Sequence, residues 1–402
     1  MLTVRARKER FPVLGFVVFI SVVLLLVAGI HLYLWQRLVR DTTTAGGRAR
    51  RVGSWAAFAL AVSVPALLIG GRSGIGWLAW GYVWIAVMFY LLVALVVLEL
   101  PMALARWQLR KRSAGAATSA SASASASDHD PERRLLLARG AAIVAGLTAT
   151  GVTAYGLRSA LGPPRIARAQ VPIGKLPRGM DGFRIATVSD IHLGPLAGRA
   201  HTERIVAMIN QLDADVVAIV GDLVDGSVGE LGPAAAPLGN LRSRHGAYFV
   251  TGNHEYFSGA QQWIDELPRL GIRVLANQRQ AINGLDLAGV HDVAGETEGM
   301  GPDFDAALGD RDPARPVVLL AHQPIQASEA ASRGVDLQLS GHTHGGQMAP
   351  FNLLVKLQQP VVSGLGEVDG MPLFVTNGAG FWGPPVRVGA PPEIALVQLR
   401  SA

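Results

Sequence analysis

The first 160 residues are dominated by four apolar stretches, which are separated by short polar or basic segments. The first and the third stretch are strongly apolar and exceed 20 residues, and that length is enough to cross about 30 Å of hydrocarbon. The other two are weaker, since one is short and contains Pro65 and the other is rich in Gly, Ala and Thr and contains Arg139. The stretches are Phe11–Leu34, Trp55–Ile69, Trp77–Leu98 and Leu135–Leu157. This pattern predicts a transmembrane region of three helices over residues 1–112 and a fourth helix over residues 135–160.

The sequence predicts two linkers. Residues 113–134 include a strict alternation of Ser and Ala over Ser119–Ser127, which is typical of a low-complexity linker. The triplet Gly162-Pro163-Pro164 predicts the end of the fourth helix, because proline cannot continue the helical hydrogen-bond ladder. Residues 161–182 are therefore expected to form a second linker.

An arginine pair, Arg133 and Arg134, precedes the weakly apolar fourth stretch. Such a pair resembles a twin-arginine export signal, which would make the fourth helix a signal anchor. Two ordinary basic residues at the cytoplasmic end of a helix would give the same pattern, so both interpretations stay open. The small residues of Ala167-Arg-Ala169 add the hypothesis of a cleavage site after Ala169.

From residue 183 onward the pattern changes to short apolar runs, each of which ends in polar residues. Runs of this length bounded by turn-forming residues are typical of buried strands. The runs are Phe183–Val188, Val216–Val220, Tyr248–Thr251, Val317–Leu320 and Leu337–Leu339. Helical patterns over Ala200–Gln211 and Gln261–Leu270 alternate with the first strands, which predicts an α/β fold with parallel crossovers. The polar ends of such strands meet at one edge of the sheet.

The polar ends supply carboxylate, amide and imidazole groups but no thiolate. The candidate metal ligands are Asp190, His192, Asp222, Asn253, His322, His342 and His344. This mixture suits Mn, Fe or Zn better than Ca or Cu(I). Seven donors are too many for one ion, so the set predicts two divalent cations that share a carboxylate.

Charge divides the chain at the same place as the hydrophobic pattern. Residues 1–170 carry 20 Lys and Arg against 6 Asp and Glu, whereas residues 171–402 carry 16 against 24. The basic excess lies beside the apolar stretches, and the acidic second half argues against binding to nucleic acid. If all four stretches cross the membrane, the loops on one side carry 11 basic residues and those on the other side carry 5. The positive-inside rule then predicts an extracytoplasmic second half.

The complete absence of cysteine excludes a disulfide framework, a thiolate zinc site and a cysteine nucleophile. The sequence also lacks a phosphate-binding glycine loop, a dinucleotide fingerprint and a serine nucleophile elbow.

The order of motifs is Asp-x-His, Gly-Asp-x-x-Asp, Gly-Asn-His-Glu, a single His and Gly-His-Thr-His. From Phe183 to the C-terminus the chain thereby resembles the calcineurin-like metallophosphoesterase superfamily. Membrane stretches followed by an Arg pair resemble its bacterial membrane-associated branch, which includes phosphodiesterases similar to YkuE and YaeI and UDP-2,3-diacylglucosamine pyrophosphatases. The resemblance implies a metallophosphoesterase domain over residues 183–402, with two β-sheets flanked by helices.

The resemblance also assigns roles to the candidate ligands. It implies that Asp190, His192 and His344 hold the first cation together with Asp222, which bridges to the second. The ligands that complete the second cation would be Asn253, His322 and His342. His254 would then be the catalytic histidine, although a histidine at such a turn can also make a purely structural hydrogen bond.

The expected chemistry is attack on phosphorus by a metal-bridging hydroxide, with His254 as general acid for the leaving group. We expect a membrane-anchored phosphoesterase that acts on a phosphodiester or a pyrophosphate, and the membrane stretches point to a lipid headgroup such as a UDP-diacylglucosamine-like substrate. The alternatives are a phosphomonoesterase and a metal-binding membrane scaffold without turnover. The expected partners are the phosphoester substrate and the bilayer.

Three further residues have two interpretations each. Asp225 either orients a ligand histidine or caps a turn. Glu255 either hydrogen-bonds a ligand or is solvated. Arg387 either contacts substrate phosphate or is an ordinary surface arginine, and the loop Gly380–Pro385 before it is expected to close over the site.

Overall fold

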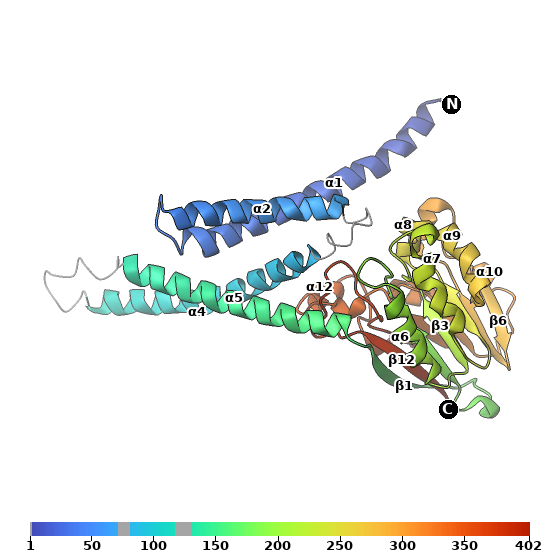
Figure 1. Cartoon of the computed structure of the whole chain (residues 1–402). Coiled ribbons are helices and arrows are strands. Elements are labelled where there is room, and N and C mark those ends of the chain that lie inside the picture. The colour runs from blue at the N-terminus through green and yellow to red at the C-terminus, as the bar shows by residue number, and fades with distance from the viewer. Residues whose placement is uncertain (1, 71–80, 117–130) are drawn as a thin grey trace. The chain divides into compact units, whose positions relative to one another are not determined.

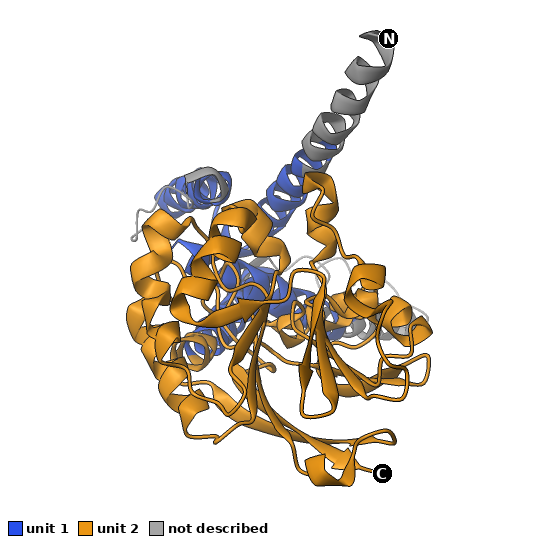
Figure 2. Cartoon of the chain, turned by 90° about the vertical axis from the view of Figure 1, so that its right-hand side faces the viewer, with its two compact units in different colours: residues 1–154 blue, residues 155–402 orange. Residues whose placement is uncertain are grey.

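A computed structural model of the chain describes residues 2–70, 81–116 and 131–402. The chain divides into two compact units, Met1–Ala154 and Tyr155–Ala402 (Figure 2). The last helix of the first unit continues across this boundary and ends in the second unit.

The first unit is made of long apolar helices (Figure 1). They are α1 (Leu2–Trp35), which continues as the short π-helix η1 (Gln36–Arg40), α2 (Arg48–Gly70), α4 (Tyr82–Ala116) and α5 (Pro131–Leu161). Polar contacts connect α1 to α4, since the Trp84 indole N–H donates to the His31 ring at 3.3 Å and Arg37 forms an ion pair with Glu99. These contacts fix the two helices side by side within this unit.

Three segments of the described residues are long and apolar enough to cross a membrane, namely Ile20–Arg40, Tyr82–Pro101 and Arg134–Leu161. They correspond to the first, third and fourth predicted stretches. The second predicted stretch lies within α2, which forms the expected helix but is not among these three segments. The beginning of the third stretch, Trp77–Trp80, and the Ser119–Ser127 repeat lie outside the described residues.

The second unit contains two mixed six-stranded sheets. Their strand orders are β1-β12-β2-β3-β4-β5 and β10-β11-β9-β8-β7-β6. The strands of the first sheet are β1 (Arg165–Ile173), β2 (Arg184–Val188), β3 (Val216–Val220), β4 (Ala247–Val250), β5 (Ile272–Val274) and β12 (Glu393–Ser401). Those of the second sheet are β6 (Gln278–Ile282), β7 (Leu285–Gly289), β8 (Val317–Leu320), β9 (Leu337–Ser340), β10 (Gly364–Val368) and β11 (Met371–Val375).

Short helices connect the strands. The α-helices are α6 (Arg199–Asn210), α7 (Val228–Ala235), α8 (Asn253–Ser258), α9 (Ala260–Glu266), α10 (Phe304–Leu308), α11 (Ala327–Ser332) and α12 (Asn352–Val355). The 3-10 turns are η2 (Arg178–Met180), η3 (Ala236–Asn240), η4 (Leu267–Leu270), η5 (Val293–Glu298), η6 (Pro324–Gln326) and η7 (His344–Gly346). The two predicted helices correspond to α6 and to α9 with η4.

Both faces of the central strands are buried, which explains why these strands are continuous apolar runs rather than alternating ones. Alternate residues of β3, Val216 and Val220, pack with Leu320 of β8 in a core between the two sheets. The intervening residues of β3 pack against α6, where Ile205 and Ile209 are buried. A third cluster covers the outer face of β8 with α10 and α11. The result is a four-layer arrangement of helices, sheet, sheet and helices (Figure 2).

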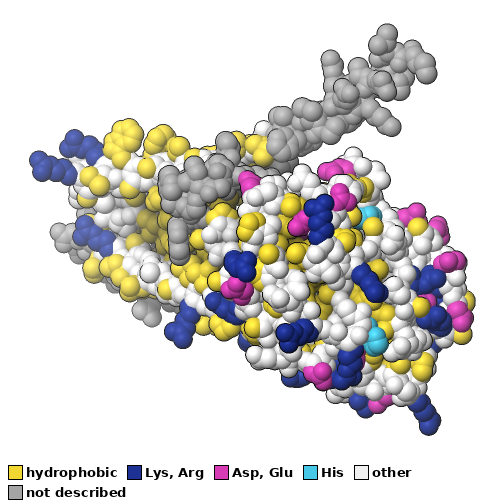
Figure 3. Space-filling view, turned by 45° about the vertical axis from the view of Figure 1, so that its right-hand side comes forward, with side chains coloured by type: hydrophobic (Ala, Val, Ile, Leu, Met, Phe, Trp, Pro, Cys, Tyr) yellow, Lys and Arg dark blue, Asp and Glu magenta, His cyan; other side chains and the backbone are white. Residues whose placement is uncertain are grey.

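The five predicted strands are present, and they fall into two sheets as the resemblance implied. Strands β2, β3 and β4 are parallel neighbours in the first sheet, and β8 and β9 are parallel neighbours in the second. The surface of the second unit that faces the viewer in Figure 3 carries acidic and basic side chains close together. It shows no continuous basic face of the kind that follows a nucleic-acid backbone.

Residues 161–182 differ from the expected linker. Helix α5 does end at Leu161, but β1 begins four residues later and pairs in parallel with β12 along nine residues. Val171 and Ile173 are buried in the core between the sheets. The strand was missed because its other residues include Arg and Gln side chains on an exposed edge. The triplet Ala167–Ala169 lies within this paired strand, so cleavage there would cut the sheet.

Candidate metal centre

Five loops, each leaving the carboxyl end of a strand, bring the predicted ligands together. The loops after β2, β3 and β4 come from the first sheet and carry four of the ligands. The loops after β8 and β9 come from the second sheet and carry the three histidines His322, His342 and His344. The centre thus lies where the ends of the two sheets meet, as parallel topology requires.

The first group consists of Asp190, His192 and His344, whose side-chain donor atoms lie within 4.8 Å of one another. The Nε2 atoms of the two histidines face each other at 3.0 Å. Nε2 of His344 is 3.3 Å from Oδ1 of Asp190. All three side chains are buried.

The second group consists of Asp222, His322 and His342, with the same mutual limit of 4.8 Å. Nδ1 of His342 is 2.9 Å from the side-chain oxygen of Asn253, which adds an amide oxygen to the group. The carboxylate of Asp222 connects the two groups, because its Oδ2 is 3.3 Å from Nε2 of His322 and 3.7 Å from Nε2 of His192.

The donor set fits a divalent cation. Nδ1 of His322 donates to the carbonyl of Val220 at 2.8 Å, which leaves Nε2 as the ring nitrogen that faces Asp222. This Nε2 is buried and has no hydrogen-bond partner, although buried polar atoms are normally satisfied. Carboxylates, an amide oxygen and imidazoles that converge without thiolates match the preferences of Mn, Fe and Zn. In addition, the ring nitrogens Nδ1 of His322 and His192 are bonded to the Val220 carbonyl and to Asp225, as is common for histidines that bind metals.

The backbone is strained at these ligands. Five of the seven have a positive φ, between 47° and 71°: Asp190, His192, Asp222, His342 and His344. A residue with a side chain rarely adopts this region and pays a conformational penalty there, so such residues cluster at functional sites. The sharp turns let each strand end aim its side chain back toward the gap between the sheets.

Two glycines allow the loops to approach closely. A Cβ atom at Gly252 would overlap Oδ1 and the backbone nitrogen of Asp222. A Cβ atom at Gly341 would overlap the carboxylate of Asp190 and the hydroxyl of Ser189. Any larger residue would push the carboxylates out of place, which explains why Gly precedes the ligand in both motifs.

Sequence comparison supports the interpretation of this geometry. Residues 183–346 match the family described as calcineurin-like phosphoesterase. An uncharacterized metallophosphoesterase of Helicobacter pylori J99 is 39% identical over 275 residues, which cover 68% of this chain and 74% of that protein. The chain belongs to the calcineurin-like metallophosphoesterase family. The resemblance in the motifs and the predicted fold class are therefore confirmed, and the family is one of phosphoric ester hydrolases.

For two other relatives, the share of their length that aligns with this chain differs. The transmembrane protein with metallophosphoesterase domain of Danio rerio is 39% identical over 64% of this chain and 63% of its own length. The uncharacterized metallophosphoesterase YkuE of Bacillus subtilis is 29% identical over 67% of this chain and 97% of its own length. The chain thus spans slightly less than two thirds of the Danio rerio protein and nearly all of YkuE.

His254 and Asp225 lie at the edge of the metallophosphoesterase centre. Asp225 Oδ1 accepts hydrogen bonds from Nδ1 of His254 at 2.6 Å and from Nδ1 of His192 at 3.0 Å. Of its two interpretations, the geometry favours orientation of histidines over capping of a turn. The backbone N–H of His254 also donates to Asp222 at 2.8 Å, which places the ring beside the ligands.

Glu255 is fully buried, which excludes the solvated alternative. Its carboxylate accepts backbone N–H bonds from Asp222 at 3.0 Å, Leu223 at 2.8 Å and Gly252 at 2.6 Å. It therefore ties the loop after β3 to the loop after β4. Burial, reinforced by the charge of Asp222, raises the pKa of Glu255 to about 8.

Arg387 is neither a surface arginine nor available to substrate. It is fully buried and donates to the carbonyls of His344 at 2.9 Å, Gly378 at 3.0 Å and Asn377. Burial lowers its pKa to about 10. Its guanidinium holds the His344 loop against the loop after β11. Both expectations for Arg387 were wrong, because the sequence does not reveal which arginine the fold encloses among backbone carbonyls.

Two aromatic side chains near His254 were not predicted as site residues. The ring centroids of Phe257 and Trp382 lie 5.6 Å and 6.4 Å from that of His254. More than half of each aromatic side chain is exposed. Trp382 belongs to the loop Gly380–Pro385, whose first residue donates to the carbonyl of Asp190 at 2.8 Å, so this loop does border the centre. The sequence feature that could have indicated Trp382 as a site residue is its position in a loop rich in Gly and Pro.

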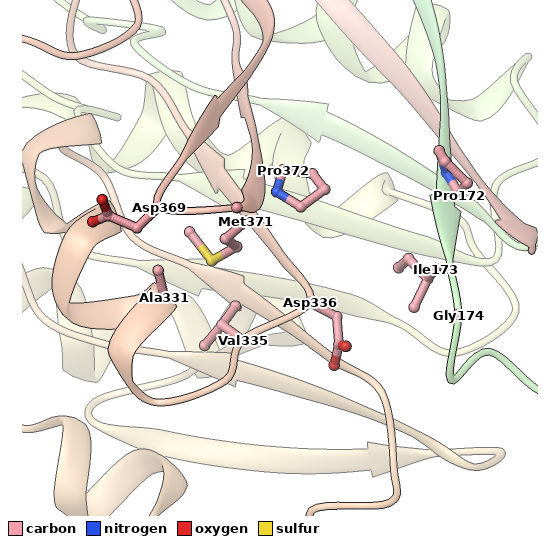
Figure 4. Close-up of a pocket in the computed structure, with 10 residues that line it drawn as sticks. Pro172, Ile173, Gly174, Ala331, Val335, Asp336, Asp369, Met371 and Pro372 are labelled. Carbon is pink, nitrogen blue, oxygen red and sulfur yellow. The ribbon is translucent and has the colours of Figure 1, made fainter.

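The pocket in Figure 4 is a separate feature. It encloses about 340 Å³ beside Pro172, Asp336, Asp369 and Met371. Asp336 immediately precedes β9, whereas His342 follows the other end of that strand. The pocket therefore lies at the opposite end of the sheet from the metal centre, and none of the seven predicted ligands lines it.

Burial and neighbouring charges raise the pKa of some histidines in the centre and lower the pKa of others. Burial alone lowers the pKa of His192, but neighbouring carboxylates, Asp225 foremost, raise it to about 9. Burial also lowers the pKa of His322, and Asp222 reverses this effect and raises the pKa well above its usual value. Burial lowers the pKa of His342 to about 3, and the charge of His322 contributes. Carboxylates thus hold protons on two imidazoles, and those protons must leave when a metal takes the same nitrogens.

This coupling predicts pH-dependent metal affinity. Because the folded pKa of His192 is raised to about 9, Mn²⁺ must displace its proton at neutral pH, and the affinity rises about tenfold per pH unit for each proton displaced. The contribution of His192 to this rise ends above pH 9, where its imidazole is already neutral. Calorimetric titration of the chelator-stripped chain with Mn²⁺ in buffers of different ionisation enthalpy measures both effects. His192→Gln should reduce the slope of Mn²⁺ affinity against pH, and the control His245→Gln should leave this slope unchanged. Equal Mn²⁺ affinity at pH 6.5 and pH 8.5 would contradict the prediction.

Proposed function

We propose that the chain is a membrane-anchored, dinuclear metal-dependent phosphoesterase. One divalent cation would be held by Asp190, His192, Asp222 and His344, and the other by Asp222, Asn253, His322 and His342. The observation that carries this proposal is the position of the Asp222 carboxylate, which lies within 4 Å of an imidazole nitrogen of each group. The donor types favour Mn, Zn or Fe as the metal.

Bound cations would lower the pKa of a coordinated water to near neutrality and bind the oxygens of the phosphoryl group. The chain itself supplies the proton for the leaving oxygen. Since Asp225 accepts from Nδ1 of His254, the ring is held with Nε2 left to carry the transferable proton. Asp225 thus positions His254 as the general acid and holds His192 in the matching orientation.

A phosphodiester or a pyrophosphate is the substrate class we favour over a phosphomonoester. A monoester carries a second negative charge at neutral pH, and the predicted phosphate contact, Arg387, is buried and bonded to carbonyls. The exposed rings of Phe257 and Trp382 beside His254 suit a leaving group with apolar parts. Together with the candidate membrane spans, this favours a lipid headgroup as the physiological substrate.

The proposal predicts metal-dependent diester hydrolysis that requires Asp222 and His254. With Mn²⁺ and bis(p-nitrophenyl) phosphate, Asp222→Asn should lower kcat/KM by at least about 100-fold, because both cations lose a ligand. On a diester that releases an alkoxide, His254→Ala should lower it by about 10² to 10⁴ through loss of the general acid, and the loss should be smaller on bis(p-nitrophenyl) phosphate, because p-nitrophenolate leaves without a proton. The measurement is initial rates on the purified chain.

Asp213→Asn is the matched control, because this carboxylate is exposed and pairs only with Arg184 and Arg244. It should retain the activity. A preference for p-nitrophenyl phosphate would support the monoesterase alternative. A chain that binds two metals per molecule and hydrolyses neither ester would favour the scaffold.

We further propose a multi-pass topology with the metallophosphoesterase domain outside the cytoplasm. Helix α2 supports a fourth crossing, because it is 23 residues long and exposes Trp55, Phe58 and Val62. With four crossings, the cytoplasmic loops carry 11 basic residues against 5 outside, as the positive-inside rule requires.

The absence of cysteine makes this topology directly testable. Single-cysteine variants Ala314→Cys, in the catalytic domain, and Thr44→Cys, between α1 and α2, should differ in labelling of intact cells by a membrane-impermeant maleimide. We expect Ala314→Cys to be labelled and Thr44→Cys to be labelled only after lysis. The reverse pattern would place the domain in the cytoplasm.

A further inference from the structure

Large apolar side chains project to solvent from a segment that follows the Gly-His-Thr-His motif. They are Phe351, Leu353, Leu354 and Leu357 in and around α12, and Trp382 in the neighbouring loop. We call these five residues the apolar rim. Leu357 is 83% exposed and Leu353 60%, and soluble surfaces seldom gather large apolar groups in this way without a binding role.

The two segments that carry the apolar rim are joined to each other near the metal centre. The Gln347 side chain exchanges two hydrogen bonds with the backbone of Trp382, at 2.8 and 2.9 Å. It thereby connects the segment that leads into α12 with the loop that carries Trp382. His344 lies three residues before Gln347, and the Trp382 ring lies near His254. The Trp382 end of the rim therefore lies beside His254.

The same loops contact the end of the last candidate membrane span. The N–H of Arg387 donates to the carbonyl of Gly156 in α5 at 3.0 Å, and the N–H of Val388 donates to Gln347 at 2.8 Å. Ala160, near the end of α5, is buried with Phe381, the residue before Trp382. Because the candidate span Arg134–Leu161 ends in these contacts, the point where the chain would leave the bilayer is joined to the rim within one compact unit.

We propose that the apolar rim docks into the surface of the bilayer in which the chain is anchored. The loops of the rim contact the end of α5, so a span that ends there would bring the rim to the bilayer surface. Charge agrees with this occupant, because Lys356 lies between Leu354 and Leu357 and Arg158 occupies the last turn of α5. Apolar residues interspersed with basic ones are the composition of segments that lie at anionic lipid interfaces.

Docking would set the opening of the metal centre at the level of the lipid headgroups. A phosphoester in a headgroup could then reach His254 without leaving the membrane. This consequence rests on the proposed function, whereas the docking itself does not require turnover. The two can therefore fail separately.

The test uses the full chain in proteoliposomes that contain phosphatidylglycerol. A polarity-sensitive fluorophore is attached at Leu354→Cys in the rim, or at Ala314→Cys as a matched control that precedes β8 at the opposite end of the sheet from the centre. We expect the Leu354→Cys probe to shift to the blue and to be quenched at least twofold by lipids that carry a shallow nitroxide. The Ala314→Cys probe should show neither effect.

Two additional variants separate docking from catalysis and from folding. Leu357→Asp in the Leu354→Cys background should abolish the lipid quenching, while Asp222→Asn in the same background should retain it even without hydrolysis. A blue-shifted probe that lipid quenchers do not reach would show that protein, either a second copy or the chain's own helices, covers the rim. That outcome, or a probe that stays in water, would overturn the proposal.

Discussion

The burial of two carboxylates between two sheets is the constraint on which the rest of this domain depends. Asp190 and Asp222 are almost completely buried, and an uncompensated charge in such a place costs several kcal/mol. Four imidazoles lie around these charges, and the backbone N–H groups of His254 and His342 donate to them. The same side chains could hold divalent cations. The positive φ values at five ligands and the glycines at Gly252 and Gly341 are consequences, because they allow the loops to converge on the carboxylates.

Charged groups behind the ligands hold this arrangement. Glu255 fixes the loops after β3 and β4, Arg387 fixes the loops after β9 and β11, and Asp225 orients two histidines. Glu255 and Arg387 bond to backbone groups, and Asp225 bonds to two histidine rings. The geometry of the centre is therefore a property of the junction between the two sheets, and no single motif would keep it in isolation.

The sequence could predict the strands that are buried on both faces, because their apolar runs are continuous and end in polar motifs. It could also predict that the seven candidate ligands converge, since each follows such a run. It could not predict β1, whose pairing with β12 depends on a partner more than 200 residues away and whose exposed face is polar. Nor could it distinguish a buried Arg387 from a surface arginine, because burial is decided by segments distant in the chain.

Membrane anchorage and catalysis are connected through a short stretch of structure. Helix α5 ends among the loops that hold His344 and border His254, so the last candidate span is part of the framework of the centre. The rim on α12 would add a second contact on the same side.

The most direct test of the account is the metal content and spin coupling of the centre. The stripped chain, reloaded with Mn²⁺, should contain two ions per molecule by elemental analysis. Its electron paramagnetic resonance spectrum should show exchange coupling, because the Asp222 carboxylate lies between both groups of ligands. One ion per chain, or two ions with an uncoupled spectrum, would contradict the claim that Asp222 bridges a dinuclear centre.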